Sequence, residues 1–329
     1  MTLTVGLDVT PLVQTRAGTA RYINGLVREL GRRHDVDVRG LSFGGGARAW
    51  NLPRDALWYP VALPRSARTL DVLHCPTYRG PVVDGAPLVV TVHDLAVFRH
   101  PDAFNRWSRW YGPRVVPRVL RRARIVIAVS EFTTRELVDV LGIREEKIRV
   151  IPNAVEETFT RDGPAADGDY VLAVGTLEPR KNLPRIVDAA RRAGVELRVV
   201  GAPGWGGVEV GGNGVRWLGH VPDEELARLY RGARCVAYPS LYEGFGIPVL
   251  EAMACGTPVV TSRGGATEEL ADGAAVLVDP HDPAAIAAGI ERATWQREEL
   301  VQRGLQRARA FTWEAVAEAT VAVYEEAVS

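Results

Sequence analysis

The sequence has 329 residues, of which 47% are hydrophobic and 24% charged, and its formal net charge is zero. This composition is that of a folded globular protein and excludes a disordered or fibrous chain. No apolar run approaches the roughly 20 residues of a membrane-spanning helix, and the first residues lack the basic and apolar segments of a secretory signal, so we expect a cytoplasmic protein.

Along the first half of the chain, short apolar runs alternate with helical patterns. A strand pattern at residues 3–9 is followed by a helical pattern at 20–30. Further apolar runs occupy residues 36–41, 72–74, 88–92 and 125–129, and helical stretches cover 107–121 and 133–141. Buried strands that alternate with helices favour a parallel sheet covered on both faces.

A polar stretch at residues 160–169 contains Gly, Pro and Asp and has the composition of a linker. After it the alternation restarts. Apolar runs occupy residues 170–175, 197–201, 215–218, 235–238, 259–261 and 275–278, and helices are expected to begin near 183, 223 and 248. We therefore predict an α/β protein of two Rossmann-like, doubly wound parallel-sheet domains, whose facing strand ends form a ligand cleft.

The charge is spread unevenly between the two halves. Residues 1–160 hold 23 Lys or Arg against 16 Asp or Glu, a net of +7, and the remainder holds 17 against 24, a net of −7. Such an asymmetry indicates either an anionic partner of the first half or a coincidence of surface charges.

The strongest basic stretch covers residues 106–124, which contain seven arginines and no acidic residue, with two tryptophans and a tyrosine among them. It is either a solvated helix face or a peripheral contact with the anionic inner face of a membrane. Pro113 and Pro117 are expected to interrupt the helix. No nucleic-acid-binding motif accompanies the charge, so we predict no nucleic acid partner.

The strongest chemical signal is a pair of carboxylates, Glu243 and Glu251, that stand eight positions apart. Glu243 lies in a Gly-rich loop, and Glu251 lies in the opening turns of a helix in which Pro248 suits the first position. Glycines let the backbone approach a ligand closely, and free N–H groups at the helix start attract phosphate. A carboxylate accepts two hydrogen bonds at once, which suits the hydroxyls of a ribose or hexose. The alternative is an acid that only complements the helix dipole.

A second signal is the pair of adjacent cations Arg180 and Lys181, which follow a strand and a turn and precede a helix. Arginine offers a planar fork for phosphate oxygens and lysine a compact positive charge. A solvated charged turn is the alternative.

These two motifs, in this order and separation, resemble those of the retaining glycosyltransferases of family 4, which have the GT-B fold. The resemblance covers nearly the whole chain. Weaker matches are Asp8 with the loop at 16–22, and the segments 91–94, 128–133, 150–155 and 313–324. The resemblance implies an acceptor-binding domain at 1–160, a nucleotide-sugar-binding domain at 161–310, and a last helix at 311–329 that crosses back onto the first domain.

The resemblance also implies roles for individual residues. Arg180 and Lys181 would neutralise the donor diphosphate, Glu243 would contact the transferred sugar, and Glu251 the ribose hydroxyls. His93 would contact the donor sugar or the acceptor. Further donor-binding positions are Gly18, Thr19, Phe245, Gly246 and Ile247, and acceptor-side candidates are His74 and Asp94.

The sequence supports Gly18 and His74 less strongly than the other positions. The first loop reads Ala-Gly-Thr where the family often has two close glycines, which weakens the match at Gly18. His74 ends a predicted strand and is either an acceptor-side residue or a packed structural histidine.

The expected reaction moves a hexose from a nucleotide-diphosphate sugar to a hydroxyl of a glycan, lipid-linked or small-molecule acceptor. A loose likeness to mannosyltransferases of bacterial glycan assembly makes mannose a candidate. Because fixed cations stabilise the leaving diphosphate, no cofactor and no metal is required. Asp35 and Asp37 match the Asp-x-Asp pattern of metal-dependent transferases but lie in the wrong domain for the donor.

Two alternatives remain on the same fold. One is a catalytically silent sugar-nucleotide-binding protein, which the fold alone does not exclude. The other is a GT-B phosphorylase or epimerase. A phosphorylase that uses pyridoxal phosphate needs a Schiff-base lysine, and the chain has only Lys147 and Lys181.

Overall fold

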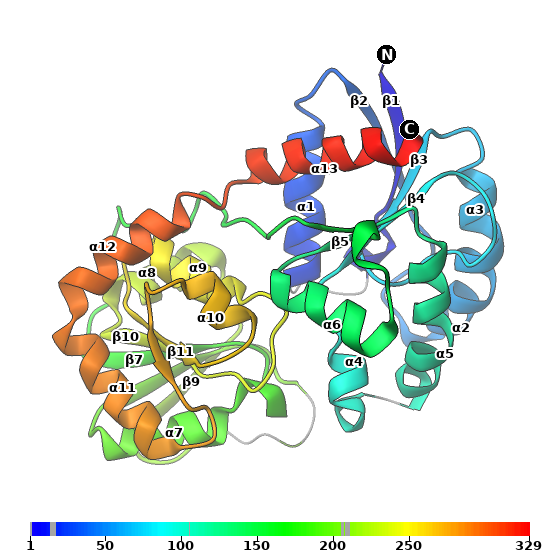
Figure 1. Cartoon of the computed structure of the whole chain (residues 1–329). Coiled ribbons are helices and arrows are strands. Elements are labelled where there is room, and N and C mark those ends of the chain that lie inside the picture. Colours follow the sequence, from blue (N-terminus) through cyan, green and yellow to red (C-terminus); the bar gives the residue numbers. More distant parts are fainter. Residues whose placement is uncertain (1, 14–17, 105, 205–206, 208–210) are drawn as a thin grey trace. The chain divides into compact units, whose positions relative to one another are not determined.

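The computed structural model describes residues 2–13, 18–104, 106–204, 207 and 211–329 (Figure 1). The chain divides into two compact units. Unit 1 comprises Met1–Asn153 and Trp313–Ser329, and unit 2 comprises Ala154–Thr312. The polar stretch at 160–169 thus lies within unit 2, a few residues after the point where the units divide.

Unit 1 is built on a parallel sheet of six strands in the order β2-β1-β3-β4-β5-β6. The strands are β1 (Leu3–Asp8), β2 (Val36–Leu41), β3 (Val72–Cys75), β4 (Leu88–Val92), β5 (Ile125–Ala128) and β6 (Ile148–Val150). Every residue of β3, β4 and β5 is buried, because helices cover both faces of the sheet.

The helices of unit 1 differ widely in length. The longer ones are α1 (Gly18–Leu30), α5 (Arg106–Arg122), α6 (Glu131–Leu141) and α13 (Trp313–Val328). Short ones are η1 (Thr10–Val13), η2 (Arg48–Trp50), α2 (Asn51–Pro53), the π-helix η3 (Arg54–Ala62), α3 (Leu63–Ser66), α4 (Ala96–Arg99), η4 (Pro101–Ala103) and η5 (Glu145–Lys147). Ser130 caps α6 by accepting a hydrogen bond from the Thr133 backbone N–H, and Gly142 ends it in the left-handed conformation.

Unit 2 repeats this architecture with strands in the order β12-β11-β10-β7-β8-β9, all parallel. The strands are β7 (Tyr170–Val174), β8 (Glu196–Val200), β9 (Val215–Gly219), β10 (Cys235–Tyr238), β11 (Val259–Ser262) and β12 (Val276–Val278). The helices are η6 (Pro179–Lys181), α7 (Leu183–Arg192), α8 (Asp223–Gly232), α9 (Ile247–Ala254), α10 (Ala266–Ala271), α11 (Pro283–Trp295) and α12 (Arg297–Ala308). The two sheets confirm the predicted α/β class.

The prediction that Pro113 and Pro117 interrupt the basic helix is wrong, because α5 runs through both residues without a break. Each proline removes one backbone donor, and the helix persists because its inner face is anchored. Tyr111, Val116 and Leu120 are buried in the core of unit 1. That burial outweighs the two lost hydrogen bonds.

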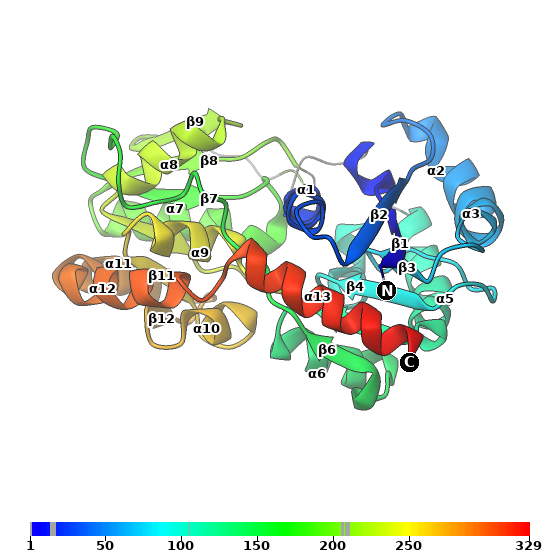
Figure 2. The same ribbon diagram turned by 90° about the horizontal axis from the view of Figure 1, so that it is seen from above.

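Helix α13 returns the last residues of the chain to unit 1, where it packs against α1 and beside β3 and β4 (Figure 2). The Trp313 indole lies over Gly25 of α1, and the Tyr324 ring contacts His74 of β3 with ring centroids 5.6 Å apart. Among the described residues, none of the helices is both long and apolar enough to cross a membrane.

The contact between α1 and α13 leaves no room for a side chain at Gly25. A Cβ there would lie 2.3–2.5 Å from three atoms of the Trp313 indole. We therefore expect Gly25→Ala to lower the free energy of unfolding by about 1–3 kcal/mol, measured by urea denaturation. Gly40→Ala in β2 is the control, since its Cβ would meet Val9 at an ordinary 3.5 Å. Equal stability of the two variants would contradict the tight packing of α13 on α1.

Candidate active site

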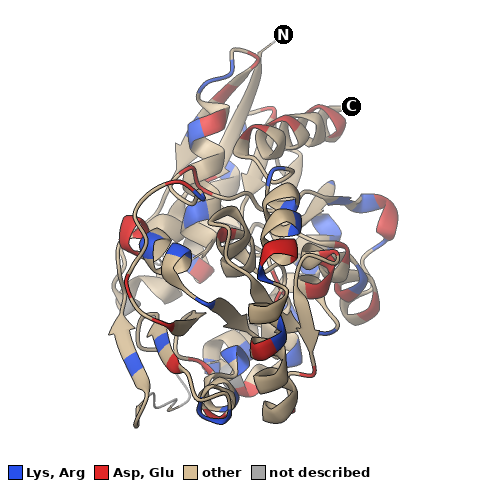
Figure 3. Cartoon of the chain, turned by 90° about the vertical axis from the view of Figure 1, so that its left-hand side faces the viewer, with Lys and Arg blue, Asp and Glu red and all other residues tan. Residues whose placement is uncertain are grey.

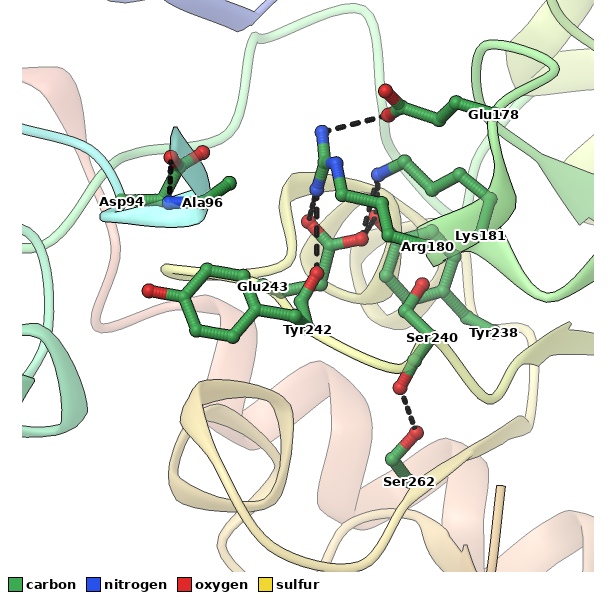
Figure 4. A network of polar contacts seen from close by, with 10 residues as sticks. All are labelled: Asp94, Ala96, Glu178, Arg180, Lys181, Tyr238, Ser240, Tyr242, Glu243 and Ser262. Carbon is green, nitrogen blue, oxygen red and sulfur yellow. Dashed lines mark hydrogen bonds and ion pairs between the residues drawn. The ribbon is translucent and has the colours of Figure 1, made fainter. Parts of the chain in front are cut away.

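A buried polar network lies at the C-terminal ends of two neighbouring strands of unit 2 (Figure 4). Arg180 and Lys181 belong to η6, which follows β7, and Glu243 lies in the loop that follows β10. Because β7 and β10 are adjacent and parallel, residues about 60 positions apart meet at one edge of the sheet. This is the edge at which open parallel sheets bind ligands.

The Glu243 carboxylate is the centre of this network. One oxygen accepts a hydrogen bond from Arg180 Nη1 at 2.8 Å, and the other accepts one from Lys181 Nζ at 2.6 Å. The Tyr238 hydroxyl donates to the second oxygen at 2.9 Å and accepts from Lys181 Nζ at 2.6 Å. The two motifs that the sequence singled out separately are therefore in direct contact.

The charges in the network shift one another's pKa values. Burial raises the pKa of Glu243, but the charges of Lys181 and Arg180 outweigh that effect and lower it to about 2. Burial lowers the pKa of Lys181, and the charge of Glu243 opposes this shift. For the Tyr238 hydroxyl, burial and the nearby Glu243 charge raise the pKa well above its usual value. Glu243 is thus ionised at neutral pH.

A second carboxylate, which the sequence analysis did not single out, completes the network. Glu178 Oε1 lies 2.7 Å from Arg180 Nη2. Burial raises the pKa of this carboxyl despite the opposing charge of Arg180. Two carboxylates and two cations give the network a formal charge of zero, so the cations expected to face a diphosphate are internally neutralised in this structure.

The turn that carries the cations is fixed by Asn182, which the sequence analysis also did not single out. Its backbone is left-handed, with φ of 61°, a conformation that asparagine adopts more readily than most residues. Its Nδ2 donates to the carbonyls of Pro239 at 2.9 Å and Pro280 at 2.6 Å. These bonds tie η6 to the segments that follow β10 and β12. The sequence signal was an Asn directly after a charged turn.

Glu251, the other carboxylate of the motif, lies in α9. It is 2% exposed and accepts a hydrogen bond from the Tyr230 hydroxyl of α8 at 2.9 Å. Helix α9 begins at Ile247 after Gly246, whose φ is 109° and where a Cβ would approach Thr267 to 2.9 Å. Pro248 is therefore the second helical residue, and the prediction that it is the first is wrong by one position.

In unit 1, His93 and Asp94 follow β4. His93 Nε2 donates to the Pro76 carbonyl at 3.0 Å, and its ring stands edge-on to Tyr22 with centroids 4.9 Å apart. Burial lowers the pKa of His93, which favours the neutral ring at pH 7. Asp94 Oδ1 accepts from the Ala96 backbone N–H at the start of α4.

Of the two alternatives for His74, its surroundings favour the packed structural histidine. The side chain is fully buried, and its ring nitrogens bond to the hydroxyls of Tyr324 at 2.7 Å and Thr91 at 2.8 Å. Burial lowers its pKa to about 3. With both nitrogens in use, His74 is a structural residue that joins β3, β4 and α13.

Gly18 and Thr19 are the first two residues of α1, and Arg16 and Ala17 of the same loop lie outside the described residues. Asp35 and Asp37 pair with their neighbours Arg33 and Arg39 rather than with each other. Within the part of the chain that the structure describes, no cluster of three or more His, Cys, Asp or Glu side chains could hold a metal ion.

Comparison with known proteins agrees with this architecture. Residues 155–310 match the family model of glycosyl transferases group 1, and residues 16–159 match that of glycosyltransferase family 4. The chain is 33% identical over 266 residues to the O-antigen chain mannosyltransferase B of Escherichia coli, covering 72% of this chain and 70% of that protein. It is equally similar to a D-inositol 3-phosphate glycosyltransferase of Acidothermus cellulolyticus and to the MMP alpha-(1->4)-mannosyltransferase of Mycolicibacterium hassiacum, at 33% identity each. These matches cover 74% of this chain but only 63% and 66% of the two relatives, slightly under two thirds of their lengths.

Solved structures share the fold over almost the whole chain. Sucrose-phosphate synthase of Thermosynechococcus elongatus superposes with a TM-score of 0.77 at 21% identity, covering 98% of both chains. Anabaena HepE in complex with UDP and glucose gives 0.74 at 20% identity, covering 99% of this chain and 100% of that one. Two Rossmann-like units of this kind define the GT-B class of glycosyltransferases. Within that class, the chain belongs to glycosyltransferase family 4.

The pKa of Glu243 links the stability of unit 2 to pH. The folded-state pKa, about 2, is below the usual 4.5, so the network's contribution to stability is fully present above about pH 4.5 and is lost as the pH falls toward 2. We expect Glu243→Gln to be less stable than the unmodified chain by about 3 kcal/mol at neutral pH. This difference should shrink as the pH is lowered, in urea denaturation across that range.

The matched control is Glu225→Gln, which removes an exposed carboxylate paired with Arg228 on α8. Exposed pairs contribute about 0–1 kcal/mol, so this variant should track the unmodified chain at every pH. A stability loss in Glu243→Gln that stays constant down to acidic pH would contradict the assigned ion pairs.

Proposed function

We propose that this glycosyltransferase moves a hexose from a nucleotide-diphosphate sugar to a hydroxyl of a glycan, lipid-linked or small-molecule acceptor. The observation that carries the proposal is the convergence of Arg180 and Lys181 on one carboxylate at the C-terminal edge of the unit 2 sheet. A diphosphate needs paired cations of this kind. The complex of HepE with UDP and glucose supports a nucleotide sugar as the donor.

The names of the relatives support the proposal that this chain transfers mannose. Two of the three relatives compared above are mannosyltransferases, and the third acts on D-inositol 3-phosphate by its name. The acceptor we propose is accordingly a hydroxyl of a polar, sugar-like molecule.

Catalysis in this proposal is mainly electrostatic. Cleavage of the bond between sugar and diphosphate places negative charge on the leaving group, which Arg180 and Lys181 stabilise most in the transition state. The backbone N–H groups of Phe245, Gly246 and Ile247, at the start of α9, also stabilise the negative charge of the leaving diphosphate. Because the protein supplies this positive charge, the reaction proceeds without a metal or other cofactor.

Glu243 contacts the transferred sugar in this scheme, where its charge stabilises the positive character of the reacting carbon. A carboxylate paired with two cations and a pKa of about 2 is a poor nucleophile. We therefore propose attack by the acceptor on the same face from which the diphosphate leaves, with retention of configuration. Glu251 contacts the ribose, and His93, whose Nε2 is used by Pro76, offers Nδ1 to the donor sugar or the acceptor.

Several contacts argue against the alternative functions. Lys147 Nζ donates to the carbonyls of Arg121 at 2.8 Å and Ala123 at 2.9 Å, and Lys181 belongs to the Glu243 network. Both lysines are therefore engaged elsewhere, which disfavours a phosphorylase that binds pyridoxal phosphate. The intact network disfavours a catalytically silent protein.

Turnover of nucleotide sugars tests the proposal directly. We expect the purified chain to release sugar or transfer it from one member of a panel that includes GDP-mannose and UDP-glucose. Arg180→Ala and Lys181→Ala should each lower kcat/KM by at least about a hundredfold, because each removes a charge that pairs with the leaving group. Arg192→Ala, at an exposed arginine of α7 paired with Asp188, is the control and should keep normal turnover. Near-normal turnover of both site variants would refute the assignment.

The proposed independence from metal has its own test. Activity should be unchanged after treatment with EDTA, because Arg180 and Lys181 supply the positive charge. Complete loss of activity that manganese restores would overturn this part of the proposal. It would make Asp35 and Asp37 candidate metal ligands again.

We also propose that unit 1 contacts an anionic membrane surface through the outer face of α5. Arg106, Trp110, Arg114 and Arg118 follow one another at four-residue intervals and form one exposed row on the helix. Trp110 is 46% exposed, and the Arg114 guanidinium lies 5.5 Å from its ring centroid. In the described residues, no carboxylate lies within ion-pair distance of Arg114 or Arg118.

Apolar side chains extend this surface at the N-terminal end of α5. Trp107, 37% exposed, stacks on Trp110 with ring centroids 5.1 Å apart. Its indole N–H donates to Asp55 at 2.6 Å, which brings the π-helix η3 and its 58% exposed Leu57 next to α5. Aromatic and aliphatic groups beside unpaired arginines suit the interface of an anionic bilayer.

Three exposed arginines of unit 2 are arranged differently. On three helices of unit 2, an arginine pairs with a carboxylate one helical turn away, and Figure 3 shows acidic and basic residues interspersed. The pairs are Arg192–Asp188 on α7, Arg228–Glu225 on α8 and Arg303–Glu299 on α12. The unpaired row on α5 is therefore not a general property of this arginine-rich chain.

Vesicle co-sedimentation tests the membrane contact. The chain should bind vesicles of phosphatidylcholine mixed with phosphatidylglycerol, bind phosphatidylcholine alone weakly, and dissociate in high salt. Arg114→Glu with Arg118→Glu should abolish binding, since each basic residue contributes about 1 kcal/mol near an anionic surface. Arg192→Glu with Arg303→Glu, in unit 2, is the matched control. Equal binding by both double variants, or a preference for nucleic acid over vesicles, would contradict the proposal.

A further inference from the structure

We propose that Glu178 is the exchangeable counter-ion of Arg180: it holds the guanidinium in the donor-free chain and releases it when the donor diphosphate binds. This inference rests on the proposed function and adds a positioning residue to it.

The contacts of Arg180 are the first argument for such an exchange. Nη1 donates to Glu243 Oε2 at 2.8 Å and to the Tyr242 carbonyl at 3.3 Å, and Nη2 lies 2.7 Å from Glu178 Oε1. Both terminal nitrogens thus already face a carboxylate. A diphosphate that pairs with the same two nitrogens competes with these acceptors.

The two carboxylates are held very differently. Glu243 accepts from Arg180, Lys181 and the Tyr238 hydroxyl, so its release would break three charged or polar contacts. In the residues that the structure describes, Arg180 is the side chain that holds the Glu178 carboxylate. Release of Glu178 therefore costs less than release of Glu243.

The backbone of Glu178 does not need to move. Its carbonyl accepts the Lys181 backbone N–H at 3.0 Å, which fixes the first turn of η6. In the proposed exchange only the Glu178 side chain rotates away from Arg180, and the backbone bond that fixes the turn carrying both cations stays in place. The donor-free arrangement is thus close to the one that binds the diphosphate.

Charge balance supplies the reason for the exchange. Glu178, Glu243, Arg180 and Lys181 together carry no net charge, so the intact network attracts an anion weakly. Removal or neutralisation of the Glu178 charge leaves one net positive charge beside the diphosphate. The groups that face Glu178 are Arg180, Lys181 and Glu243, and burial already raises its pKa, which makes it the easier of the two carboxyls to protonate.

Calorimetric titration with GDP and with UDP tests this inference. Glu178→Gln keeps the size and an acceptor oxygen but removes the competing charge, and should bind one of the nucleotides about tenfold more tightly than the unmodified chain at mildly alkaline pH. The advantage should vanish as the pH falls, because protonation makes Glu178 of the unmodified chain neutral as well. Glu178→Asp, which keeps the charge, should retain the pH dependence of the unmodified chain.

Glu196→Gln provides the matched control. Glu196 begins β8 and therefore lies at the opposite edge of the same sheet, where it pairs with Arg198 at 2.8 Å. The affinity of the Glu196→Gln variant for both nucleotides should equal that of the unmodified chain at every pH.

The outcomes separate this inference from the proposed function. If the unmodified chain binds nucleotide while Glu178→Gln binds equally or more weakly, Glu178 only orients Arg180 and the counter-ion role is overturned. If the unmodified chain binds neither nucleotide at any pH, the proposed function fails and the inference fails with it.

Discussion

The burial of the Glu243 carboxylate between Arg180 and Lys181 is the constraint on which the arrangement of unit 2 depends. A buried charge is tolerated only when it is paired and hydrogen-bonded, and an incomplete pair costs several kcal/mol. The pairing requires the C-terminal ends of β7 and β10 to be adjacent, which the strand order provides. It also requires η6 to be held in place, which Asn182 achieves through its bonds to two carbonyls.

The same constraint links stability to the proposed chemistry. A site prepared for a diphosphate holds positive charge close together, and that arrangement would be unstable in an unliganded chain without counter-ions. Glu243 and Glu178 supply them, so the donor-free network is neutral. In the proposed reaction, the diphosphate takes over part of this role, and the cations are already in position when the leaving group develops its charge.

Periodicity and composition were sufficient to predict the two motifs and every strand of both parallel sheets except the short edge strand β6, because buried strands and charged turns are local features of the sequence. Contacts between distant residues were not predictable in this way. Arg180 and Glu243 are separated by 63 positions, and their contact depends on β10 lying beside β7. The sequence did not decide between the two alternatives for His74, because its partner, Tyr324, is 250 positions away. The unbroken α5 likewise depends on the tertiary burial of its inner face, which outweighs its two prolines.

A crystal structure of the chain with the nucleoside diphosphate that it binds would test the role of the two cations most directly. We expect phosphate oxygens within hydrogen-bonding distance, about 3 Å, of the Arg180 guanidinium and Lys181 Nζ. We also expect Glu178 to have turned away while Tyr238 keeps Glu243 in place. A nucleotide bound elsewhere, with the contacts of Arg180 to Glu178 and of Lys181 to Glu243 unchanged, would contradict the assignment of these cations to the donor diphosphate.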